Sequence, residues 1–434
     1  MQSSQQASYI AETRPYGVLG RVLGHSYTPT IYRELAGLDY VRFEREPKDV
    51  EAFLRGDEWE GVNVTIPYKK LAAEMVDELS PIAQRLGNVN TITRLVDGRL
   101  RGDNTDYFGF KMLVEALGLE LAGKRALVFG GHGGAGSTCM VVLGDLGMEP
   151  VAVCRTAESA EQAGAASAFP SITYEELDAY RDAALVVNAT PVGMYPNCPE
   201  SIWPLDAFPS LLAVVDIVYN PARTGLMMEA ERRGIPTIGG LLMLVAQAAA
   251  AVERYTGNVV ALERIREVTA ALDATEENIA LIGMPGAGKT RVGSELAALL
   301  GRDHIDIDAE LENALGMSCS EFITSQGEDA FRREETKALR RIAGRSGLVI
   351  SCGGGVVTRE ENYPLLHQNS RIVMLDRRLE ELSSKGRPIT ARDGIEALAA
   401  QRMDTYRAWA DIVIRSRESA AATAHALKEE LCAH

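Results

Sequence analysis

Short apolar segments alternate with amphipathic segments along the first part of the chain, and this pattern predicts strands and helices in turn. Strands are predicted at 16–20, 40–43 and 61–66, and helices at 30–36, 49–56 and 68–77. Such alternation is typical of βαβ units, whose strands form a mostly parallel sheet with helices on its faces. The pattern therefore predicts an α/β fold.

A second run of this kind begins at residue 124 and contains a glycine-rich turn. Strands predicted at 124–129 and 149–154 enclose a helix at 137–146, and the turn before that helix has G-x-G-x-x-G at Gly131, Gly133 and Gly136. In this strand–turn–helix–strand context the glycines indicate a dinucleotide site, with pyrophosphate at the helix N-terminus. Strands at 184–188 and 213–217 follow, and then a long helix from Gly240.

The end of the second strand of this unit indicates which dinucleotide binds. NAD enzymes place an acidic residue there for the ribose hydroxyls, whereas this chain has Cys154, Arg155 and Thr156. A guanidinium and a hydroxyl suit a 2′-phosphate, so the prediction is NADP(H).

A third nucleotide motif lies near residue 280. A strand at 279–282 leads into Gly283–Thr290, which fits G-x-x-x-x-G-K-[ST], and a helix is predicted at 291–300. In this motif the loop backbone (Gly286, Ala287, Gly288) binds phosphates, Lys289 reaches the β- and γ-phosphates, and Thr290 ligates Mg²⁺. The motif therefore predicts an ATP site at the start of a second domain of about 150 residues. The polar stretch 273–278 before it is predicted to be a linker.

Composition narrows the class of protein. The 434 residues have room for two or three domains, and a net charge of −15 argues against a nucleic-acid or anionic-membrane surface. No apolar run is long enough to span a membrane, and the N-terminus lacks a signal-peptide pattern. The six cysteines are scattered without metal-type spacing, which favours reduced thiols in a cytoplasm. Oligomeric state is not predicted.

Polar residues gather where the first strands end. They include Ser26 and Thr28, then Asn63, Thr65 and Lys69 in one motif, Asn90 in the next turn, and Asp103 with Asp106. Each one alone is explained as a turn former or a helix cap. Ligands of open α/β sheets bind at the carboxyl ends of the strands, so the joint arrangement favours a binding site.

These motifs resemble two known families. The first 270 or so residues resemble shikimate dehydrogenase, through H-S-x-T-P (25–29), N-V-T-I-P-x-K (63–69), V-N-T (89–91), G-D-N-T-D (102–106), the glycine turn, N-A-T-x-x-G-M (188–194), D-x-x-Y-x-P-x-x-T (216–224) and G-x-x-M-L-x-x-Q (240–247). Residues from about 276 onward resemble shikimate kinase, through the phosphate loop, D-I-D (306–308), G-E-D-A-F-R (327–332), G-G-G (353–355), G-R-P (386–388) and R-x-x-x-Y (402–406).

The dehydrogenase resemblance implies reduction of 3-dehydroshikimate to shikimate by NADPH, with Lys69 and Asp106 as the catalytic pair. It implies a substrate site of Ser26, Thr28, Thr65, Asn90, Asp106, Tyr219 and Gln247. It implies a cofactor site of Gly131, Gly133, Gly134, Ala135, Arg155, Thr156, Thr190 and Met243. The chemistry is consistent, because an ammonium held by a carboxylate can protonate and stabilise a developing alkoxide. Which of Lys69 and Asp106 is the general acid stays open.

The chain departs from the dehydrogenase pattern at three places. Thr28 stands where serine is common, and its added methyl narrows the pocket. Cys154 replaces the asparagine that usually precedes the Arg-Thr pair. Gly130 replaces an apolar residue at the end of the strand before the glycine turn, and the turn itself carries His132.

The kinase resemblance implies phosphorylation of shikimate at its 3-hydroxyl by ATP. It implies metal-site roles for Thr290 and Asp306, catalytic roles for Asp308 and for the lid residue Arg387, and a substrate site of Asp308, Arg332, Gly353, Gly354, Gly355 and Arg402. Guanidinium groups suit a carboxylate, and phosphoryl transfer depends mainly on positioning and cations. The segment between Leu379 and Arg402 is shorter than a typical lid.

Three functions are compatible with these residues. The favoured one is a bifunctional enzyme that performs both reactions, in which residues 1–272 form the dehydrogenase and 279–434 form the kinase, a P-loop fold. Within the dehydrogenase, residues 14–106 and helices at 240–272 would form the substrate subdomain, and 107–239 a Rossmann subdomain. The second is a quinate or quinate/shikimate dehydrogenase, and pocket residues such as Thr28 would decide it. The third makes the C-terminal region a nucleotide-sensing module, which the intact phosphate-loop and arginine residues argue against.

Overall fold

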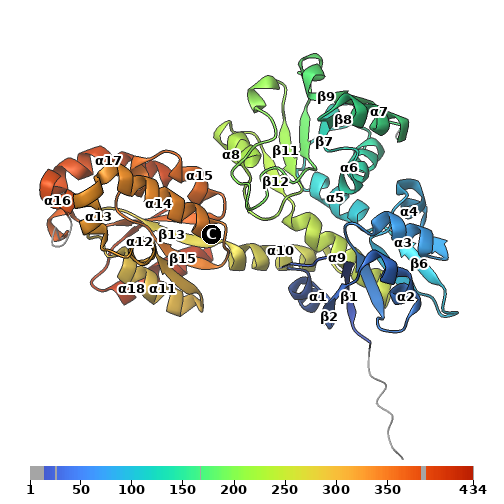
Figure 1. Cartoon of the computed structure of the whole chain (residues 1–434), viewed down its shortest axis with the longest axis horizontal. Helices are drawn as coiled ribbons and strands as arrows, with labels where there is room; N and C mark the ends of the chain where they lie inside the picture. The colour runs from blue at the N-terminus through green and yellow to red at the C-terminus, as the bar shows by residue number, and fades with distance from the viewer. Residues whose placement is uncertain (1–13, 25–26, 167, 383–387, 434) are drawn as a thin grey trace, which may run out of the picture. The chain divides into compact units, whose positions relative to one another are not determined.

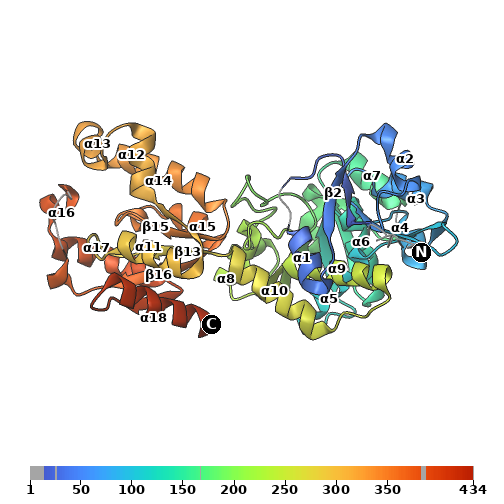
Figure 2. The same cartoon turned by 90° about the horizontal axis from the view of Figure 1, so that it is seen from below.

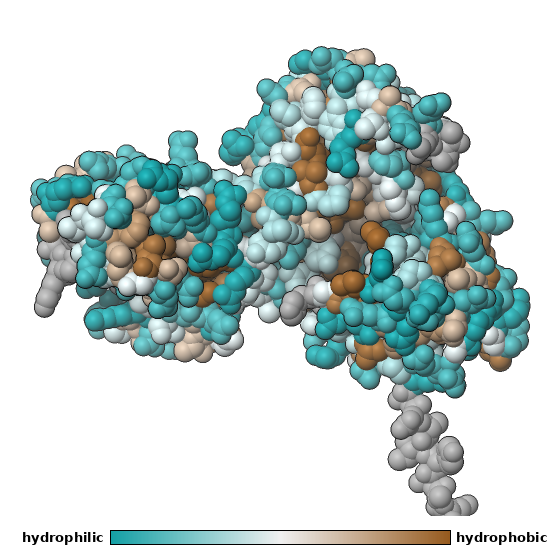
Figure 3. All heavy atoms as spheres, viewed as in Figure 1, coloured by the Kyte–Doolittle hydropathy of each residue, from teal (hydrophilic) through white to brown (hydrophobic). Residues whose placement is uncertain are grey.

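The computed structural model describes residues 14–24, 27–166, 168–382 and 388–433, and these residues form three open sheets (Figure 1). The chain divides into two compact units. The first contains the residues up to Thr190, Asp206–Ile217 and Pro236–Ala270, and the second contains Pro191–Leu205, Val218–Ile235 and the residues from Ala271 onward. Hydrophilic residues cover most of the face seen in Figure 3. None of the described helices is both long and apolar enough to cross a membrane.

The first sheet has the strand order β2-β1-β3-β5-β6-β4. Its strands are β1 (Tyr16–Gly20), β2 (Tyr40–Glu44), β3 (Gly61–Val64), β4 (Glu78–Leu79), β5 (Thr91–Arg94) and β6 (Leu100–Asp103). The helices between them are α1 (Thr28–Ala36), α2 (Val50–Arg55), α3 (Lys69–Met75), α4 (Pro81–Leu86) and α5 (Asp106–Glu115). The predicted strands and helices are present, with ends that differ by a few residues.

The hairpin of β5 and β6 was not among the predicted elements. β5 pairs antiparallel with both β3 and β6, whereas β1 pairs parallel with β2 and β3. The signal for this hairpin is the Asp97–Gly98 pair between the two strands. Gly98 has φ 84°, a conformation that hairpin turns require and glycine adopts without strain.

The second sheet is entirely parallel, with the order β12-β11-β10-β7-β8-β9. Its strands are β7 (Arg125–Phe129), β8 (Glu149–Cys154), β9 (Ser171–Thr173), β10 (Leu185–Asn188), β11 (Ala213–Asp216) and β12 (Thr237–Gly239), with helices α6 (Gly134–Asp145) and α7 (Ala157–Ala166). In chain order this is 3-2-1-4-5-6, the arrangement of dinucleotide-binding folds. The strand order reverses between β7 and β10, which is the point where ligands of such sheets bind.

Helix α9 (Leu241–Thr256) packs against α5 (Figure 2). The contact is close, because a Cβ on Gly109 of α5 would lie 2.6 Å from the carbonyl oxygen of Met243. Helix α10 (Leu262–Glu276) follows and leads directly to the next strand at Asn278. Within the predicted linker 273–278, residues 273–276 are helical and belong to α10, because alanine and glutamate favour helix and Thr275 donates a hydrogen bond to Ala271 O.

The third sheet is also parallel, with the order β14-β15-β13-β16-β17. Its strands are β13 (Asn278–Ile282), β14 (Asp303–Asp306), β15 (Leu348–Ser351), β16 (Ser370–Asp376) and β17 (Ile412–Arg415). Helices α11 (Lys289–Leu300) and α18 (Ala420–Ala433) lie on one face, and α14 (Glu328–Ala343) and α15 (Asn362–His367) on the other (Figure 1). The remaining helices of this unit are α8 (Gly225–Arg232), α12 (Ile307–Leu315), α13 (Cys319–Gln326), α16 (Pro388–Asp393) and α17 (Ile395–Trp409).

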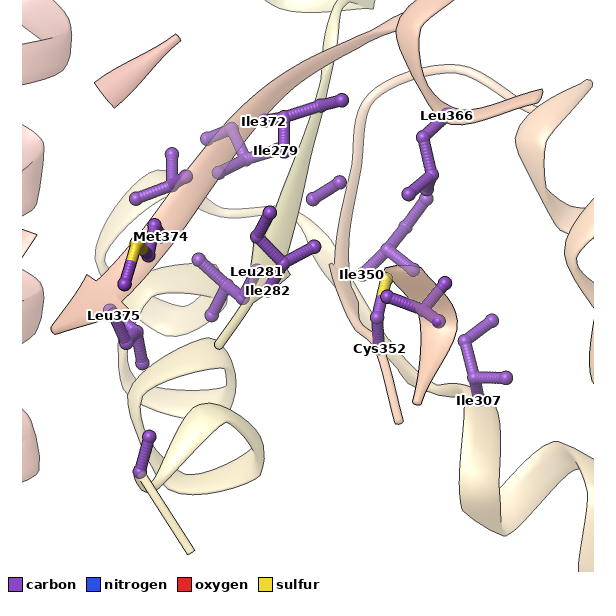
Figure 4. Close-up of a cluster of buried hydrophobic side chains, with 14 of the residues drawn as sticks. Ile279, Leu281, Ile282, Ile307, Ile350, Cys352, Leu366, Ile372, Met374 and Leu375 are labelled. Carbon is purple, nitrogen blue, oxygen red and sulfur yellow. The ribbon is translucent and has the colours of Figure 1, made fainter. Parts of the chain in front are cut away.

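The core of this sheet supports the phosphate loop. Side chains of Ile279 and Leu281 on β13 cluster with Ile350 and with Ile372 and Met374 on β16 (Figure 4). Every residue of β13 is buried, as expected for a central parallel strand covered on both faces. Because β13 lies between β15 and β16, its carboxyl end opens at the reversal of strand order, where ligands of such sheets bind.

Candidate active sites

The predicted catalytic pair of the first unit is in direct contact. Lys69 Nζ lies 2.5 Å from Asp106 Oδ2, and the two side chains are 19% and 12% exposed. Lys69 is the first residue of α3 and Asp106 the first residue of α5. The pair is thus an ammonium held by a carboxylate, with limited access to water.

Asn90 lies beside this pair and is held by the loop that carries Asp106. Its side-chain oxygen accepts hydrogen bonds from Thr105 N at 2.7 Å and from Thr91 Oγ1 at 3.0 Å. Thr105 Oγ1 also lies 3.4 Å from Gln247 Oε1 on α9, so Asn90, Asp106 and Gln247 meet at one place. Because the oxygen of Asn90 is used within the protein, its amide nitrogen is the group that can donate to a ligand hydroxyl.

The other predicted substrate residues lie at strand ends or in loops. Thr28 is the first residue of α1, and the half-buried Thr65 follows β3. Tyr219 comes after β11 in the chain and belongs to the second unit, and burial raises the pKa of its phenol, so that it stays a neutral donor. Ser26 lies outside the described residues.

The glycine turn after β7 has the shape that a dinucleotide site needs. A Cβ on Gly136 would lie 2.0 Å from Gly130 O, so this glycine permits the close approach of helix and turn. Gly134 at the start of α6 has no neighbouring atom within 4 Å of such a Cβ, and Gly133 has only Gly130 O at 3.4 Å. The turn therefore leaves open space at the N-terminus of α6, where pyrophosphate would bind.

The end of β8 carries the residues predicted to recognise a 2′-phosphate. Arg155 is exposed, and Thr156 Oγ1 accepts from Ser159 N at 3.2 Å, which caps α7. His132 of the glycine turn lies beside this strand end, with Nδ1 3.5 Å from Cys154 Sγ. Burial raises the pKa of the Cys154 thiol, so the sulfur keeps its proton at neutral pH.

Thr190, a predicted cofactor residue, is fixed by a buried pair, Asn188 and Asp216, which begin two of the motifs quoted above but received no predicted role. Asn188 Nδ2 donates to both carboxylate oxygens of Asp216 at 3.0 Å, and Asn188 Oδ1 accepts from Thr190 N and from Thr190 Oγ1 at 2.7 Å. The neighbouring strands β10 and β11 bring Asn188 and Asp216 together. The sequence places them at the start of two separate motifs and does not show that they pair.

The phosphate loop of the second unit has three glycines in conformations that other residues rarely adopt. Gly283, Gly286 and Gly288 have φ of 138°, 87° and 95°. Lys289 Nζ donates to Gly283 O at 2.8 Å, within the loop. Thr290 Oγ1 donates to Asp306 Oδ2 at 2.6 Å, so the two predicted metal-site residues are in contact.

Asp308 and its neighbours form an acidic and basic cluster near this loop. Asp306 Oδ1 accepts from Asp308 N at 2.9 Å, and Arg332 donates to Glu335 Oε2 at 2.7 Å. Asp308 is exposed to the cavity, and the protein around the cavity desolvates its carboxylate in part. That desolvation, together with the charges of Glu335 and Asp306, raises the pKa of Asp308 to about 6.

The three consecutive glycines after β15 allow the predicted substrate arginines to approach the backbone. A Cβ on Gly355 would lie 1.9 Å from Arg332 Cζ, and one on Gly353 would lie 2.4 Å from Glu335 Oε1. Arg402 donates to Gly354 O at 3.1 Å, and Tyr406 hydrogen-bonds to the same oxygen. Two guanidinium groups therefore face one glycine segment.

A cavity of about 870 Å³ connects these groups, and it is lined by the phosphate loop, Asp306, Asp308, Arg332, Gly353–Gly355 and Arg402. Cys319, Arg377 and Arg417 also line it, and the sequence pattern did not point to them. They come from α13 and from the ends of β16 and β17, which no motif marks. Arg387, the predicted lid arginine, lies outside the described residues.

Comparison with known proteins assigns the larger part of the chain. A shikimate dehydrogenase (NADP(+)) from Methanopyrus kandleri is 36% identical over 284 residues, which are 61% of this chain and 97% of the relative. The chain belongs to the shikimate dehydrogenase family. A second shikimate dehydrogenase (NADP(+)), from Halorubrum lacusprofundi, is 40% identical over 260 residues, which are 56% of this chain and 93% of that protein. The family model of the shikimate dehydrogenase substrate binding domain matches residues 18–92.

A solved structure supports the same assignment. Shikimate 5-dehydrogenase from Thermus thermophilus, in complex with NADP(H) and shikimate, is 34% identical and covers 60% of this chain, with 99% of its own length matched and a TM-score of 0.54. Residues 285–432, beyond the dehydrogenase, match the shikimate kinase family model. The α/β fold and both predicted family assignments are confirmed. The chain is a bifunctional shikimate-pathway enzyme, an oxidoreductase joined to a phosphotransferase.

Proposed function

We propose that this chain reduces 3-dehydroshikimate to shikimate with NADPH at the Lys69–Asp106 pair, and that its kinase part then transfers a phosphoryl group from ATP to the 3-hydroxyl of shikimate. The observation that carries the first half is the 2.5 Å contact between Lys69 Nζ and Asp106 Oδ2. The kinase half is supported by the cavity that brings the phosphate loop, Asp308 and two arginines together.

The dehydrogenase residues have distinct roles in this proposal. Bound NADPH supplies the hydride, and the open N-terminus of α6 with Arg155 and Thr156 fits its pyrophosphate and 2′-phosphate. Lys69 donates a hydrogen bond to the ketone oxygen and stabilises the negative charge that develops there. Asp106 holds the ammonium in place, and a proton moves from this pair to the alkoxide. Asn90 donates to a ring hydroxyl through its amide nitrogen.

The kinase residues position two anionic substrates. Lys289 and the loop backbone hold the phosphates of ATP, and Arg332 and Arg402 bind the carboxylate of shikimate. Asp308 accepts the proton of the attacking hydroxyl. Thr290 Oγ1 and Asp306 provide the oxygen ligands that Mg²⁺ prefers, and their 2.6 Å contact fits a shared ion that would supply positive charge beside the phosphates. A cytoplasmic location, the roles of Ser26 and Arg387, and the domain boundaries at 272 and 279 remain predictions from sequence.

The direct test follows NADPH oxidation with 3-dehydroshikimate, with and without ATP and Mg²⁺, and identifies the products by mass. Shikimate without ATP, and shikimate 3-phosphate with ATP, are the expected products. Accumulation of shikimate in the presence of ATP and Mg²⁺ would contradict the kinase half and favour a nucleotide-sensing role. A higher kcat/KM with 3-dehydroquinate, the precursor of quinate, would contradict the substrate assignment, and consumption of NADH rather than NADPH would contradict the cofactor assignment.

A further inference from the structure

A buried hydrogen-bond cluster lies behind the substrate strands of the dehydrogenase, centred on Asn63 of β3. Three phenols point at its side-chain oxygen: Tyr32 Oη at 2.6 Å, Tyr40 Oη at 2.8 Å and Tyr255 Oη at 2.9 Å. They come from α1, β2 and α9, and the rings of Tyr32 and Tyr40 stack with centroids 4.0 Å apart. Asn63 is only 7% exposed. One buried amide thus joins four separate elements.

The environment of Asn63 fixes the orientation of its amide. Its Nδ2 lies 3.1 Å from the backbone oxygen of Asn90, which can only accept a hydrogen bond. The nitrogen must therefore face Asn90, and the oxygen must face the phenols. An amide oxygen has two lone pairs, so the three phenols share them. If one phenol is removed, the other two still occupy both lone pairs of the Asn63 oxygen.

The same nitrogen continues the chain of hydrogen bonds toward the substrate residues. Asn63 Nδ2 also donates to Thr91 Oγ1 at 3.0 Å, and Thr91 Oγ1 donates to Asn90 Oδ1 at 3.0 Å. A hydroxyl has a single proton. Because Thr91 Oγ1 accepts a hydrogen bond from Asn63, the hydroxyl proton of Thr91 points away from Asn63. Thr91 Oγ1 also lies 3.1 Å from Thr105 Oγ1, so its proton points to Asn90 Oδ1 or to Thr105 Oγ1, which itself lies 3.2 Å from Asn90 Oδ1. In both arrangements the direction of donation runs from Asn63 through Thr91 toward the side-chain oxygen of Asn90.

We infer that Asn63 is a positioning residue for substrate recognition. Through Thr91 it acts together with the backbone N–H of Thr105 to hold the Asn90 side-chain oxygen within the protein, so that the Asn90 amide nitrogen faces the substrate hydroxyl. This inference rests on the proposed function, since it takes Asn90 to be a substrate-binding residue. Asn63 itself has both polar atoms engaged within the protein, so it acts through Asn90 and Thr91. The tyrosine cluster holds the amide rigidly and ties it to α9, which also carries Gln247.

The sharpest test reverses this polarity without changing the shape of the side chain. Asn63→Asp keeps acceptors for the three phenols but replaces the donor that faces Asn90 O and Thr91 Oγ1. Thr91→Val, at a fully buried position, removes the connecting hydroxyl in an isosteric way. Each variant of the full chain is expected to raise KM for 3-dehydroshikimate by about tenfold, which corresponds to the loss of one to two hydrogen bonds. The Kd of NADPH and kcat should change less than threefold.

Matched controls separate this role from a structural one. Thr91→Ser restores the hydroxyl and should restore KM, and Tyr40→Phe removes a phenol whose place at the oxygen is shared and should leave KM unchanged. Thermal unfolding and the kinase activity of each chain report whether the fold is intact. Equal losses of NADPH affinity, kcat and Tm would overturn the inference in favour of a structural role. An unchanged KM in both test variants, while Asn90→Ala raises it, would overturn the inference alone. An unchanged KM in Asn90→Ala would overturn it together with the proposed role of Asn90.

Discussion

Lys69 and Asp106 meet at 2.5 Å although they are 37 positions apart in the chain, and each begins a helix. A carboxylate at the N-terminus of α5 is favoured by the helix dipole, whereas an ammonium at the N-terminus of α3 is not. Lys69 therefore occupies a position that helix stability disfavours, and the carboxylate of Asp106 compensates for it. Such a placement is expected where the lysine serves catalysis.

Replacement of the catalytic lysine should affect turnover more than binding. We expect Lys69→Ala to lower kcat of dehydroshikimate reduction by about 10²–10⁴-fold, the usual contribution of a positioned proton donor, with a smaller change in KM. Steady-state kinetics with NADPH measures this. The neighbour Lys70 is exposed, so Lys70→Ala is the matched control and should retain activity. A large rise in KM with unchanged kcat would assign Lys69 to binding alone.

Cofactor choice should depend on Arg155. Loss of its guanidinium in Arg155→Ala should raise the Kd of NADPH and of 2′,5′-ADP by about 10–100-fold, since hydrogen bonds to charged groups contribute about 1.5–3 kcal/mol. Affinity for NADH should change little, because it lacks the 2′-phosphate. Arg181→Ala, at another exposed arginine of the first unit, provides the control. Equal losses of affinity for NADPH and NADH in Arg155→Ala would exclude recognition of the 2′-phosphate by Arg155.

Two glycines of the cofactor turn should have different roles: Gly136 should be needed for the fold of the turn, and Gly134 for contact with the cofactor. Gly136→Ala would place a Cβ 2.0 Å from Gly130 O, so we expect it to distort the turn and lower Tm. Gly134→Ala meets no protein atom within 4 Å, so Tm should be kept while the Kd of NADPH rises. Thermal unfolding without ligand and NADPH titration check the two outcomes. An unchanged NADPH affinity in Gly134→Ala would place the pyrophosphate elsewhere.

Kinase activity should fall with acidification through the pKa of Asp308. Desolvation and the nearby Glu335 and Asp306 raise this pKa to about 6, and only the ionised carboxylate can accept a proton from the shikimate hydroxyl. We therefore expect kcat/KM for shikimate to be constant above pH 7 and to decline roughly tenfold per pH unit well below 6. The measurement is a pH profile at saturating ATP and Mg²⁺. Asp308→Asn should remove most activity, and a residual rate with the same acidic limb would assign the titration to another group.

The sequence alone was enough to predict the α/β fold and the two nucleotide-binding turns, through its periodic pattern and a few motifs. Alternating strands and helices, the glycine turn after β7 and the phosphate loop after β13 fix backbone shape locally, so they can be read from neighbouring residues. The same holds for β8, whose ends match the predicted 149–154. The sequence resemblance also identified both families and the pairs Lys69–Asp106 and Thr290–Asp306. Each of these features depends on residues that are close in the chain or belong to a known motif.

Only the tertiary structure decided how distant polar groups share hydrogen bonds. Asn63 begins a motif in the sequence, but Tyr32, Tyr40 and Tyr255 belong to none of the motifs, and only the fold brings all four together. The Asn188–Asp216 pair and the pKa of Asp308 likewise depend on neighbouring strands and on the exclusion of water around a cavity. Hydrogen bonding and desolvation depend on distances in space, which no single stretch of sequence contains. That is why the sequence named the substrate residues, while the structure was needed to show what orients them.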